Sequence, residues 1–429
     1  MRIAIVCSRL GYGGAERVAV MWANGFANRE HEVILISNLF EEQTYYVDER
    51  ITLCNLVSAK KNKIKKWSSA VKNVRKVVNK ELPDVIIGVM ETCSLVARIA
   101  TIGKRIPVIM TDHNSFERPA TAPMSKSKYF KKYYLNKIYI CVTVLTYADK
   151  NYIGNRLYNI VVLPNPLLLE SVGIIPRKEN IVLAAGRLDD WHCKGFDVLI
   201  KAFAKLVQCS KFKVQEDGWK LQIAGTGSEE SLNYLKQLCK ENRVEGSVEF
   251  LGFRKDVEKL YQDASIFVLS SRYEGFGLVL IEAMSQGCAC IACDYKGRQR
   301  EILCPEADSF EFQVSGSNNQ DSSIEDQMES ELSQVSVARK DPKLETIQKP
   351  EARNLKPETR NLPVEACETG ILCEPDNVDA LTEALKKMIT DNDYRESVRA
   401  KAVERSKYYS IENTMDRWED LLHRVMETH

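Results

Sequence analysis

Short apolar runs alternate with amphipathic stretches along most of this chain. The first run, residues 3–7, has the length and apolar character of a buried β-strand, and a helical pattern then extends through residue 26. Alternating strands and helices of this kind predict a doubly wound parallel sheet with helices on both faces. The later strands of this series are expected at residues 32–36, 84–89, 107–110, 141–145 and 160–163.

A second α/β series begins after Pro164-Asn165-Pro166 interrupts the pattern. The fold class is therefore α/β, with two Rossmann-like halves whose strands end at a central cleft, where such sheets bind ligands. We expect an N-terminal domain at residues 1–166, a second domain at residues 167–407 and a C-terminal helical segment at residues 408–429. Strands of the second series are expected at 180–185, 220–224, 248–251, 265–269 and 288–293.

Residues 308–363 break the alternation of strands and helices. The segment is rich in Ser, Gln, Glu, Asn and Lys, and it contains a tandem heptad in which each copy carries a proline. Such a composition buries too little apolar surface to offset its ordering entropy. We expect a disordered insertion, with a tolerated loop favoured over a binding segment.

Composition is that of an ordinary soluble enzyme, with 44% hydrophobic and 28% charged residues in 429. Neither a signal peptide nor an apolar run of about eighteen residues is apparent, so a cytoplasmic location is expected. The 13 cysteines lie in scattered strand-like and helix-like segments, which favours reduced thiols. Cys288, Cys290 and Cys293 lack a second ligand pair, which disfavours zinc.

The formal net charge of +1 conceals an excess of basic residues in the first 166 positions. The excess is concentrated at residues 60–80 and 126–134, where lysines are interleaved with aromatic residues. This pattern fits docking on an anionic membrane surface, but it equally fits a solvated helix face. No nucleic-acid-binding motif accompanies the charges, so we expect no nucleic-acid partner.

Two carboxylates, Glu274 and Glu282, flank a glycine-rich turn between an apolar strand and a helix. A strand followed by a glycine turn and a helix presents free backbone N–H groups and the positive end of the helix dipole to a phosphate. The sequence therefore predicts a diphosphate site at the helix start, where the backbone of Gly277, Leu278 and Val279 lies.

Two cations are expected to reach the same cleft. Arg187 follows the strand at 180–185, and Lys194 precedes the next helix, so both suit the neutralisation of a leaving diphosphate. Gly225 lies in a second glycine turn, which is a weaker signal because tight connections use glycine for backbone reasons. The segment at Phe253 could face a nucleobase or be an ordinary strand end.

The N-terminal glycines Gly13 and Gly14 lie between a strand and a helix. They do not match the dinucleotide fingerprint, because Glu16 occupies the place of its third glycine, so nicotinamide chemistry is disfavoured. His113 follows the strand at 107–110, whose end should face the cleft. It is a candidate contact for a sugar bound there, whether that sugar is the donor or the acceptor in a transfer reaction. The Asp391-Asn392-Asp393 segment suits helix capping better than a metal site.

In order along the chain, these motifs resemble family four of the retaining glycosyltransferases, which have the GT-B fold. Within that family, the pattern is most similar to bacterial enzymes of exopolysaccharide and capsule synthesis. One departure is the basic segment at 294–301, which stands where relatives often carry a proline-containing turn. The resemblance rests on residues 13–18, 112–114, 163–166, 186–188, 194–197, 274–282 and 410–413.

The resemblance implies transfer of a hexose or N-acetylhexosamine with retention of configuration, without a metal and with no cofactor. The donor would be a nucleotide-sugar, expected to be a UDP-sugar, and the acceptor a polyprenyl-diphosphate-linked or other saccharide at the inner membrane face. Arg187, Lys194, the Gly13-Gly14 turn and the backbone at Gly277 would hold the diphosphate. The resemblance assigns the donor-sugar hydroxyls to Glu274 and the nucleotide ribose to Glu282.

Two other functions remain open on the sequence. A sugar-nucleotide epimerase or phosphorylase would use the same fold and donor site. A nucleotide-sugar-binding protein made inactive by the insertion would keep binding but lose turnover.

Overall fold

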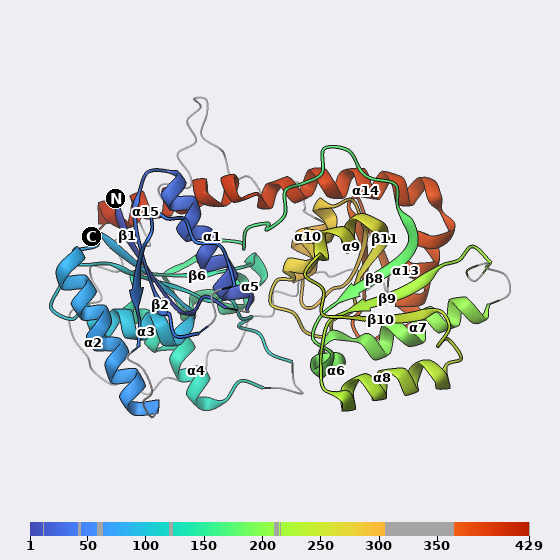
Figure 1. The fold of residues 1–429 in the computed structure, drawn as a ribbon, viewed down its shortest axis with the longest axis horizontal. Coiled ribbons are helices and arrows are strands. Elements are labelled where there is room, and N and C mark those ends of the chain that lie inside the picture. Colours follow the sequence, from blue (N-terminus) through green and yellow to red (C-terminus); the bar gives the residue numbers. More distant parts are fainter. Residues whose placement is uncertain are drawn as a thin grey trace. The chain divides into compact units, whose positions relative to one another are not determined.

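The expected alternation builds two seven-stranded sheets, which confirms the doubly wound α/β class (Figure 1). The computed structural model describes residues 1–11, 13–41, 44–57, 63–119, 123–209, 214, 216–304 and 364–428, with only the backbone at 63–66. The predicted insertion at 308–363 and the start of the basic run at residue 60 lie outside these residues. Both sheets belong to one compact unit of the chain.

The first sheet is parallel throughout, with the order β3-β2-β1-β4-β5-β6-β7. Its first strand is central, because Ile3 of β1 pairs with Val33 of β2 on one side and with Val85 of β4 on the other. The strands are β1 (Arg2–Arg9), β2 (Glu32–Asn38), β3 (Thr52–Asn55), β4 (Val85–Val89), β5 (Val108–Thr111), β6 (Cys141–Val144) and β7 (Ile160–Val162).

Helices cover both faces of this sheet. Alternate residues of β1 belong to different cores, with Ile3 and Ile5 in one cluster and Ala4 and Val6 in another. This is the two-sided burial that a parallel sheet requires. The helices of this part are α1 (Gly14–Asn28), α2 (Lys63–Glu81), α3 (Met90–Ala100), α4 (Lys126–Tyr133) and α5 (Tyr147–Ile153).

The second sheet has the order β10-β9-β8-β11-β12-β14-β13. All its pairs are parallel except that between β13 and β14. The strands are β8 (Glu179–Ala185), β9 (Lys220–Ala224), β10 (Val248–Gly252), β11 (Ala264–Leu269), β12 (Ala289–Cys293), β13 (Val364–Cys367) and β14 (Gly370–Cys373).

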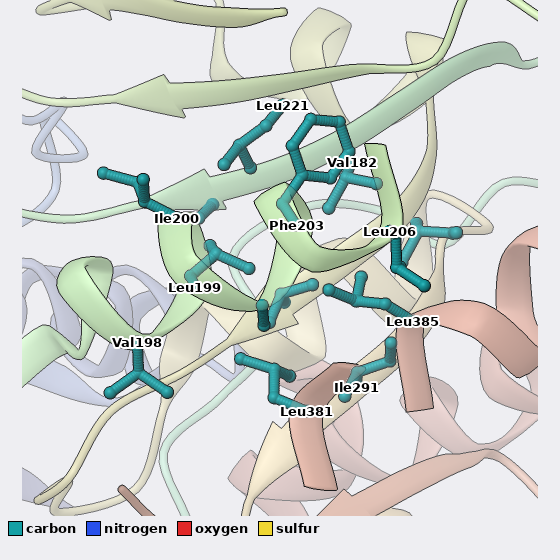
Figure 2. Packing of buried hydrophobic residues seen from close by; sticks show 14 of the residues in the cluster. Val182, Val198, Leu199, Ile200, Phe203, Leu206, Leu221, Ile291, Leu381 and Leu385 are labelled. Atoms are coloured by element: carbon teal, nitrogen blue, oxygen red, sulfur yellow. The ribbon is translucent and has the colours of Figure 1, made fainter. Parts of the chain in front are cut away.

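The largest core cluster fills one face of the second sheet. Figure 2 shows Leu199 and Phe203 of α7 packed among Val182 and Leu221 of the sheet and Leu385 of α13. The helices of this part are α6 (Trp191–Lys194), α7 (Phe196–Gln208), α8 (Glu229–Glu241), α9 (Val257–Asp263), α10 (Leu278–Ser285), α11 (Arg298–Leu303), α13 (Val378–Thr390) and α14 (Asn392–Ser406). Short 3-10 helices lie at Leu135–Ile138, Gly154–Arg156, Leu188–Asp190 and Lys407–Tyr409.

The last helix, α15 (Ile411–Thr428), packs against α1 of the first sheet. The rings of Trp22 and Trp418 meet edge to face with their centroids 4.9 Å apart, and Leu422 lies in the same cluster. The chain therefore returns to its N-terminal part at its end. The functional division of the chain at residues 166 and 407 stays a prediction.

Two details differ from the sequence analysis, and a third agrees with it. Strand β3 and the β13-β14 hairpin were not expected, because these short runs lack a strong apolar pattern. The expectation of reduced thiols is wrong for one pair, since Cys304 and Cys367 form a disulfide; the other eleven cysteines are free. The capping interpretation of Asp391 is confirmed, because its carboxylate accepts a hydrogen bond from Tyr394 N.

Candidate active site

The candidate site lies where β8 and β11 end at the topological switch of the second sheet. The chain passes from β8 to β9 on one side and from β11 to β12 on the other, so the two connections run in opposite directions along the sheet. Parallel sheets bind ligands at the carboxyl ends of the strands at such a switch point. The loop after β11 carries Glu274 and turns into α10 at Gly277, whose φ of +95° favours glycine. No side chain caps α10, so its first backbone N–H groups can bind an anion.

Lys194, the last residue of α6, and Glu274, in the loop after β11, form the central ion pair of the site. The Lys194 Nζ lies 2.7 Å from Glu274 Oε2, and Ser271 Oγ donates to the same oxygen at 3.2 Å. Burial lowers the pKa of Lys194, but the charge and hydrogen bond of Glu274 outweigh it, so the pKa is raised. The ammonium therefore stays charged at neutral pH, and its two further N–H donors can reach a ligand.

Arg272 joins the loop that carries Glu274 to the short helix α6, which ends at Lys194. Its guanidinium makes a two-pronged ion pair with Asp197, with N–O distances of 2.7 and 2.8 Å. Arg272 also donates from its backbone N to Cys193 O and from Nη1 to His192 O, the two residues before Lys194. These bonds hold the two segments in a fixed relation.

Close backbone packing adds to this constraint. A Cβ at Gly195, whose φ is +64°, would lie 2.0 Å from the carbonyl oxygen of Ser270. The Ser270 hydroxyl in turn donates to Lys194 O at 2.8 Å. Only glycine fits between the two loops at this point.

Glu282 lies one helical turn inside α10 and is 4% exposed. Its two carboxylate oxygens have different partners: Tyr261 OH donates to Oε2 at 3.2 Å, and Arg17 Nη1 lies 3.4 Å from Oε1. Burial raises the pKa of Glu282, while the Arg17 charge and the Tyr261 hydrogen bond act in the opposite direction. The carboxylate is thus a buried acceptor that depends on these two donors.

The start of α1 meets the start of α10. A Cβ at Gly14 would lie 3.7 Å from Leu278 Cδ1, so Gly14 stands in contact distance of the second helix. Gly13 has a φ of +153°, and a Cβ there would lie 2.1 Å from Glu16 Oε2. Two helix N-termini and the Gly13-Gly14 turn therefore come together beside Leu278.

His113 reaches the same loop from the first sheet. A Cβ at Gly275 would lie 3.1 Å from the His113 carbonyl oxygen, and the His113 ring lies 5.6 Å from that of Trp22. Burial lowers the pKa of His113 to about 4, although the Asp112 charge and the Asn165 side chain favour the charged form. The imidazole is therefore neutral at pH 7 and can exchange hydrogen bonds with a hydroxyl.

A buried lysine of the basic segment at 126–134 supports this histidine. Lys132 Nζ lies 2.7 Å from Asp112 Oδ2, and the two side chains are 3% and 1% exposed. Lys132 also donates to Asn114 O at 3.2 Å. The expectation of a solvated or membrane-facing segment is therefore wrong for Lys132, which points inward to the strand end before His113.

The remaining candidates lie around this centre. Arg187 pairs with Asp190 at 2.7 Å with its side chain 81% exposed, so its approach to a diphosphate stays a prediction. Gly225 packs directly against the backbone of Gly186, because a Cβ at Gly225 would lie 1.8 Å from Gly186 O. Phe253 follows β10 and is exposed. Val279 lies in the first turn of α10.

The basic segment at 294–301 is partly buried: Tyr295, Arg298 and Gln299 are buried, whereas Lys296 is exposed. Arg298 has no exposed surface and pairs with Asp149 of α5 at 2.7 Å. The Glu301 carboxylate accepts hydrogen bonds from the backbone N of Tyr147 and of Ala148, and burial raises its pKa to about 7 despite them. This departure from the family pattern therefore packs against α5.

Sequence reasoning missed Arg17, Tyr261, Asp197 and Arg272 as parts of the site. Arg17 and Arg272 were present in the motifs, one turn after Gly14 and two residues before Glu274, but an isolated arginine carries no signal of its partner. Tyr261 lies on another helix, twenty-one residues from the carboxylate that it contacts.

One group of side chains in the described part of the chain has the spacing of metal ligands. The ligand atoms of Cys304, Glu365 and Cys367 lie within 4.8 Å of one another. Because the two sulfurs are joined in a disulfide, they offer no thiolate to a metal in this state. Among the described residues, no helix has the length and apolar character needed to cross a bilayer.

Comparisons with known proteins identify related chains. The family model described as Glycosyltransferase Family 4 matches residues 12–170, and the one described as Glycosyl transferases group 1 matches residues 170–340. The amylovoran biosynthesis glycosyltransferase AmsD of Erwinia amylovora is 31% identical, covering 70% of this chain and 83% of that protein. Both halves of this chain are thus matched.

A further relative and a solved structure extend this result. The GalNAc-alpha-(1->4)-GalNAc-alpha-(1->3)-diNAcBac-PP-undecaprenol alpha-1,4-N-acetyl-D-galactosaminyltransferase of Campylobacter jejuni is 28% identical, covering 71% of this chain and 82% of that protein. The structure of Anabaena HepE in complex with UDP has a TM-score of 0.68 at 15% identity, covering 99% of this chain and 100% of that one. At this identity the structural likeness concerns the fold alone.

Replacing Arg272 with Gln should destabilise the protein by about 3 kcal/mol, because Asp197 would keep a buried charge without this partner. Arg272→Lys should recover part of the loss, since a lysine keeps the charge but not the planar fork. Chemical denaturation measures the effect. The matched control is Arg254→Gln, which breaks the solvent-screened pair with Asp256 and should cost far less stability than Arg272→Gln. Equal losses for the two glutamine variants would contradict the assignment of Arg272.

Replacing His113 with Gln should change how stability depends on pH. The folded-state pKa of about 4 lies below the unfolded value of about 6.5, so the unfolded chain takes up a proton first as pH falls. Wild-type stability should therefore decline relative to H113Q between about pH 6.5 and 4. Melting temperatures across this range test it, with the same substitution at the exposed His423 as control. A difference between wild type and H113Q that does not vary with pH would show that His113 is not held neutral.

Proposed function

We infer that this chain, which belongs to glycosyltransferase family 4 and is a transferase enzyme, uses a nucleotide-sugar as its donor. The observation that carries the proposal is the Lys194–Glu274 pair beside the uncapped start of α10. A lysine ammonium and free backbone N–H groups suit a diphosphate, whereas a carboxylate suits sugar hydroxyls. The end of α6, the loop after β11 and the start of α10 together therefore offer complementary groups to both parts of the donor.

The donor is placed by the two carboxylates. Glu274 accepts hydrogen bonds from the sugar hydroxyls, and Glu282 accepts them from the nucleotide ribose.

The diphosphate is bound mainly by backbone groups. Gly277, Leu278 and Val279 bind it through their backbone, and the Gly13-Gly14 turn lies over it. Arg187 reaches the diphosphate once it exchanges Asp190 for the ligand, and Gly225 and Phe253 lie toward the base. UDP is the proposed nucleotide, supported by the fold shared with the UDP complex of HepE.

The chemistry needs positive charge where the bond breaks. As the anomeric bond lengthens, the sugar gains oxocarbenium character and the departing diphosphate gains negative charge, so Lys194 and the start of α10 stabilise the transition state most. The acceptor hydroxyl attacks from the side that the diphosphate leaves and gives its proton to the departing diphosphate oxygen. The anomeric carbon thus exchanges its bond to the diphosphate for a bond to the acceptor oxygen with configuration retained. No protein nucleophile and no metal takes part in this proposal. Neutral His113 orients a hydroxyl beside Gly275.

The acceptor is proposed to be a sugar on a polyprenyl diphosphate, used in cell-surface polysaccharide synthesis. This is supported by the names of the relatives from Erwinia and Campylobacter, which refer to amylovoran biosynthesis and to an undecaprenyl-linked acceptor. Such an acceptor lies in a membrane, so the enzyme would work at the inner membrane face.

Helix α4 offers a surface for that membrane. Phe130 and Tyr134 are 59% and 57% exposed and stack with their centroids 5.5 Å apart. Lys126, Lys128 and Lys131 are exposed on the same short helix, which contains no acidic residue. Aromatic side chains and lysines together suit an anionic bilayer interface.

Replacing Lys194 or Glu274 with Ala should reduce sugar transfer at least 100-fold, because each change removes a charge from the site. The assay follows UDP release and product formation with a panel of UDP- and GDP-sugars. Lys205→Ala, which removes an exposed lysine of α7, is the control and should leave turnover unchanged. Turnover near the wild-type level in both site variants would refute the proposal.

The same assay separates the other functions. Donor consumption without any glycosylated product would indicate an epimerase or phosphorylase, and UDP binding without turnover would indicate a binding protein. NMR of the product should show the anomeric configuration of the donor, and an inverted product would exclude retention.

Charge reversal on α4 should weaken binding to vesicles that contain anionic lipid. Changing Lys126, Lys128 and Lys131 to Glu is expected to lower the affinity roughly 100-fold, at about 1 kcal/mol per lysine. Sedimentation with anionic and neutral vesicles measures it. The control variant changes the exposed Lys236 and Lys240 of α8 to Glu. If both variants lose affinity equally, α4 is not the docking surface.

A further inference from the structure

We propose that Arg17 is a positioning residue for the donor nucleotide: it holds the Glu282 carboxylate in the form and orientation that accept the ribose hydroxyls. The inference rests on the proposed function, in which Glu282 binds the ribose. It adds a residue from the first sheet's helices to a subsite formed by the second.

The geometry places Arg17 at the carboxylate. Arg17 lies in the first turn of α1, where its backbone N donates to Gly13 O at 3.0 Å. From there its Nη1 reaches to 3.4 Å from Glu282 Oε1. The N-terminal glycine turn and the arginine are therefore set by the same helical turn.

The carboxylate keeps room for a ligand. Tyr261 OH occupies one donor position on Oε2, and Arg17 one on Oε1. An ionised carboxylate has about four lone-pair positions, so each oxygen can accept one more hydrogen bond. Two adjacent acceptors match the two neighbouring hydroxyls of a ribose.

The protonation state of Glu282 decides whether its two oxygens can accept hydrogen bonds from the ribose hydroxyls. A protonated carboxyl would donate one hydrogen bond and lose acceptor capacity. Burial raises the pKa of Glu282, and the Arg17 charge is the largest influence that lowers it. Without Arg17, the neutral form is favoured further.

The other groups around α10 do not replace Arg17. Tyr261 of α9 offers a hydroxyl but no charge. Arg399 of α14 donates to Gly287 O, and Lys178 donates to Gln286 O and Tyr261 O. These cations bind backbone carbonyls near the end of α10, so among the described residues Arg17 is the cation in contact with the carboxylate.

The test measures binding of UDP and of uridine to the full chain by calorimetry at pH 6, 7 and 8.5. Arg17→Gln should weaken both ligands by about the same factor, at least 10-fold at pH 7, because both carry the ribose. The loss should be larger at pH 6 and smaller at pH 8.5, since higher pH restores the ionised carboxylate. Arg17→Lys should retain more affinity than Arg17→Gln.

A double-mutant comparison tests the connection to Glu282. Glu282→Gln should weaken both ligands at every pH, and adding Arg17→Gln should cause little further loss. Arg29→Gln, at the other end of α1, is the control and should bind like the wild type; melting temperatures confirm that the variants are folded. Arg29 pairs with Asp416 and Glu419 away from the site.

Three results would overturn the inference. If Arg17→Gln weakened the binding of UDP but not of uridine, Arg17 would be a ligand of the phosphates. If its loss of affinity did not vary with pH, or added fully to that of Glu282→Gln in the double variant, Arg17 would act separately from Glu282. If the wild type binds uridine and E282Q binds it with the same affinity, the proposed ribose site is refuted instead. If the wild type does not bind UDP, the donor assignment is refuted.

Discussion

The ion pair between Lys194 and Glu274 is the interaction on which the rest of the site depends. Lys194 ends the short helix α6, and Glu274 lies in the loop after β11, so the pair joins two separate segments. Their separation of 2.7 Å is maintained by Arg272, which pairs with Asp197 and bonds to the backbone of the two residues before Lys194. Removing one partner from such a partly buried network leaves a charge uncompensated, so the constraint is both geometric and electrostatic.

Elements of the first sheet contribute side chains and a glycine turn to the site at the end of the second sheet. Helix α1 contributes the Gly13-Gly14 turn and Arg17, and the end of β5 leads to His113, which stands beside Gly275. Each group acts through its surroundings: burial keeps His113 neutral, and Arg17 counteracts the effect of burial on Glu282. The proposed donor joins a charged diphosphate to an uncharged sugar, which suits charged and neutral groups at separate positions.

The basic segment at 126–134 shows how one helix can serve two environments. Its composition suggests a uniform surface, yet Lys132 turns inward to Asp112 while Phe130 and Tyr134 remain exposed. Lysine tolerates such burial when a carboxylate and a carbonyl satisfy its donors, as Asp112 and Asn114 do here. The proposed membrane surface and the strand end that carries His113 are therefore connected through a single side chain.

Local patterns along the chain were enough to predict the two sheets, most strand positions and the motifs, because apolar periodicity and glycine turns are properties of neighbouring residues. They put Glu274 in the turn after a strand, Glu282 in the helix that follows and Lys194 just before another helix, without reference to any distant contact. Which charges meet was settled by the packing of the folded chain. The pairs Arg17–Glu282 and Lys132–Asp112, the exposure of Arg187 and the burial of Arg298 depend on packing between elements far apart in the chain, which a linear pattern does not encode.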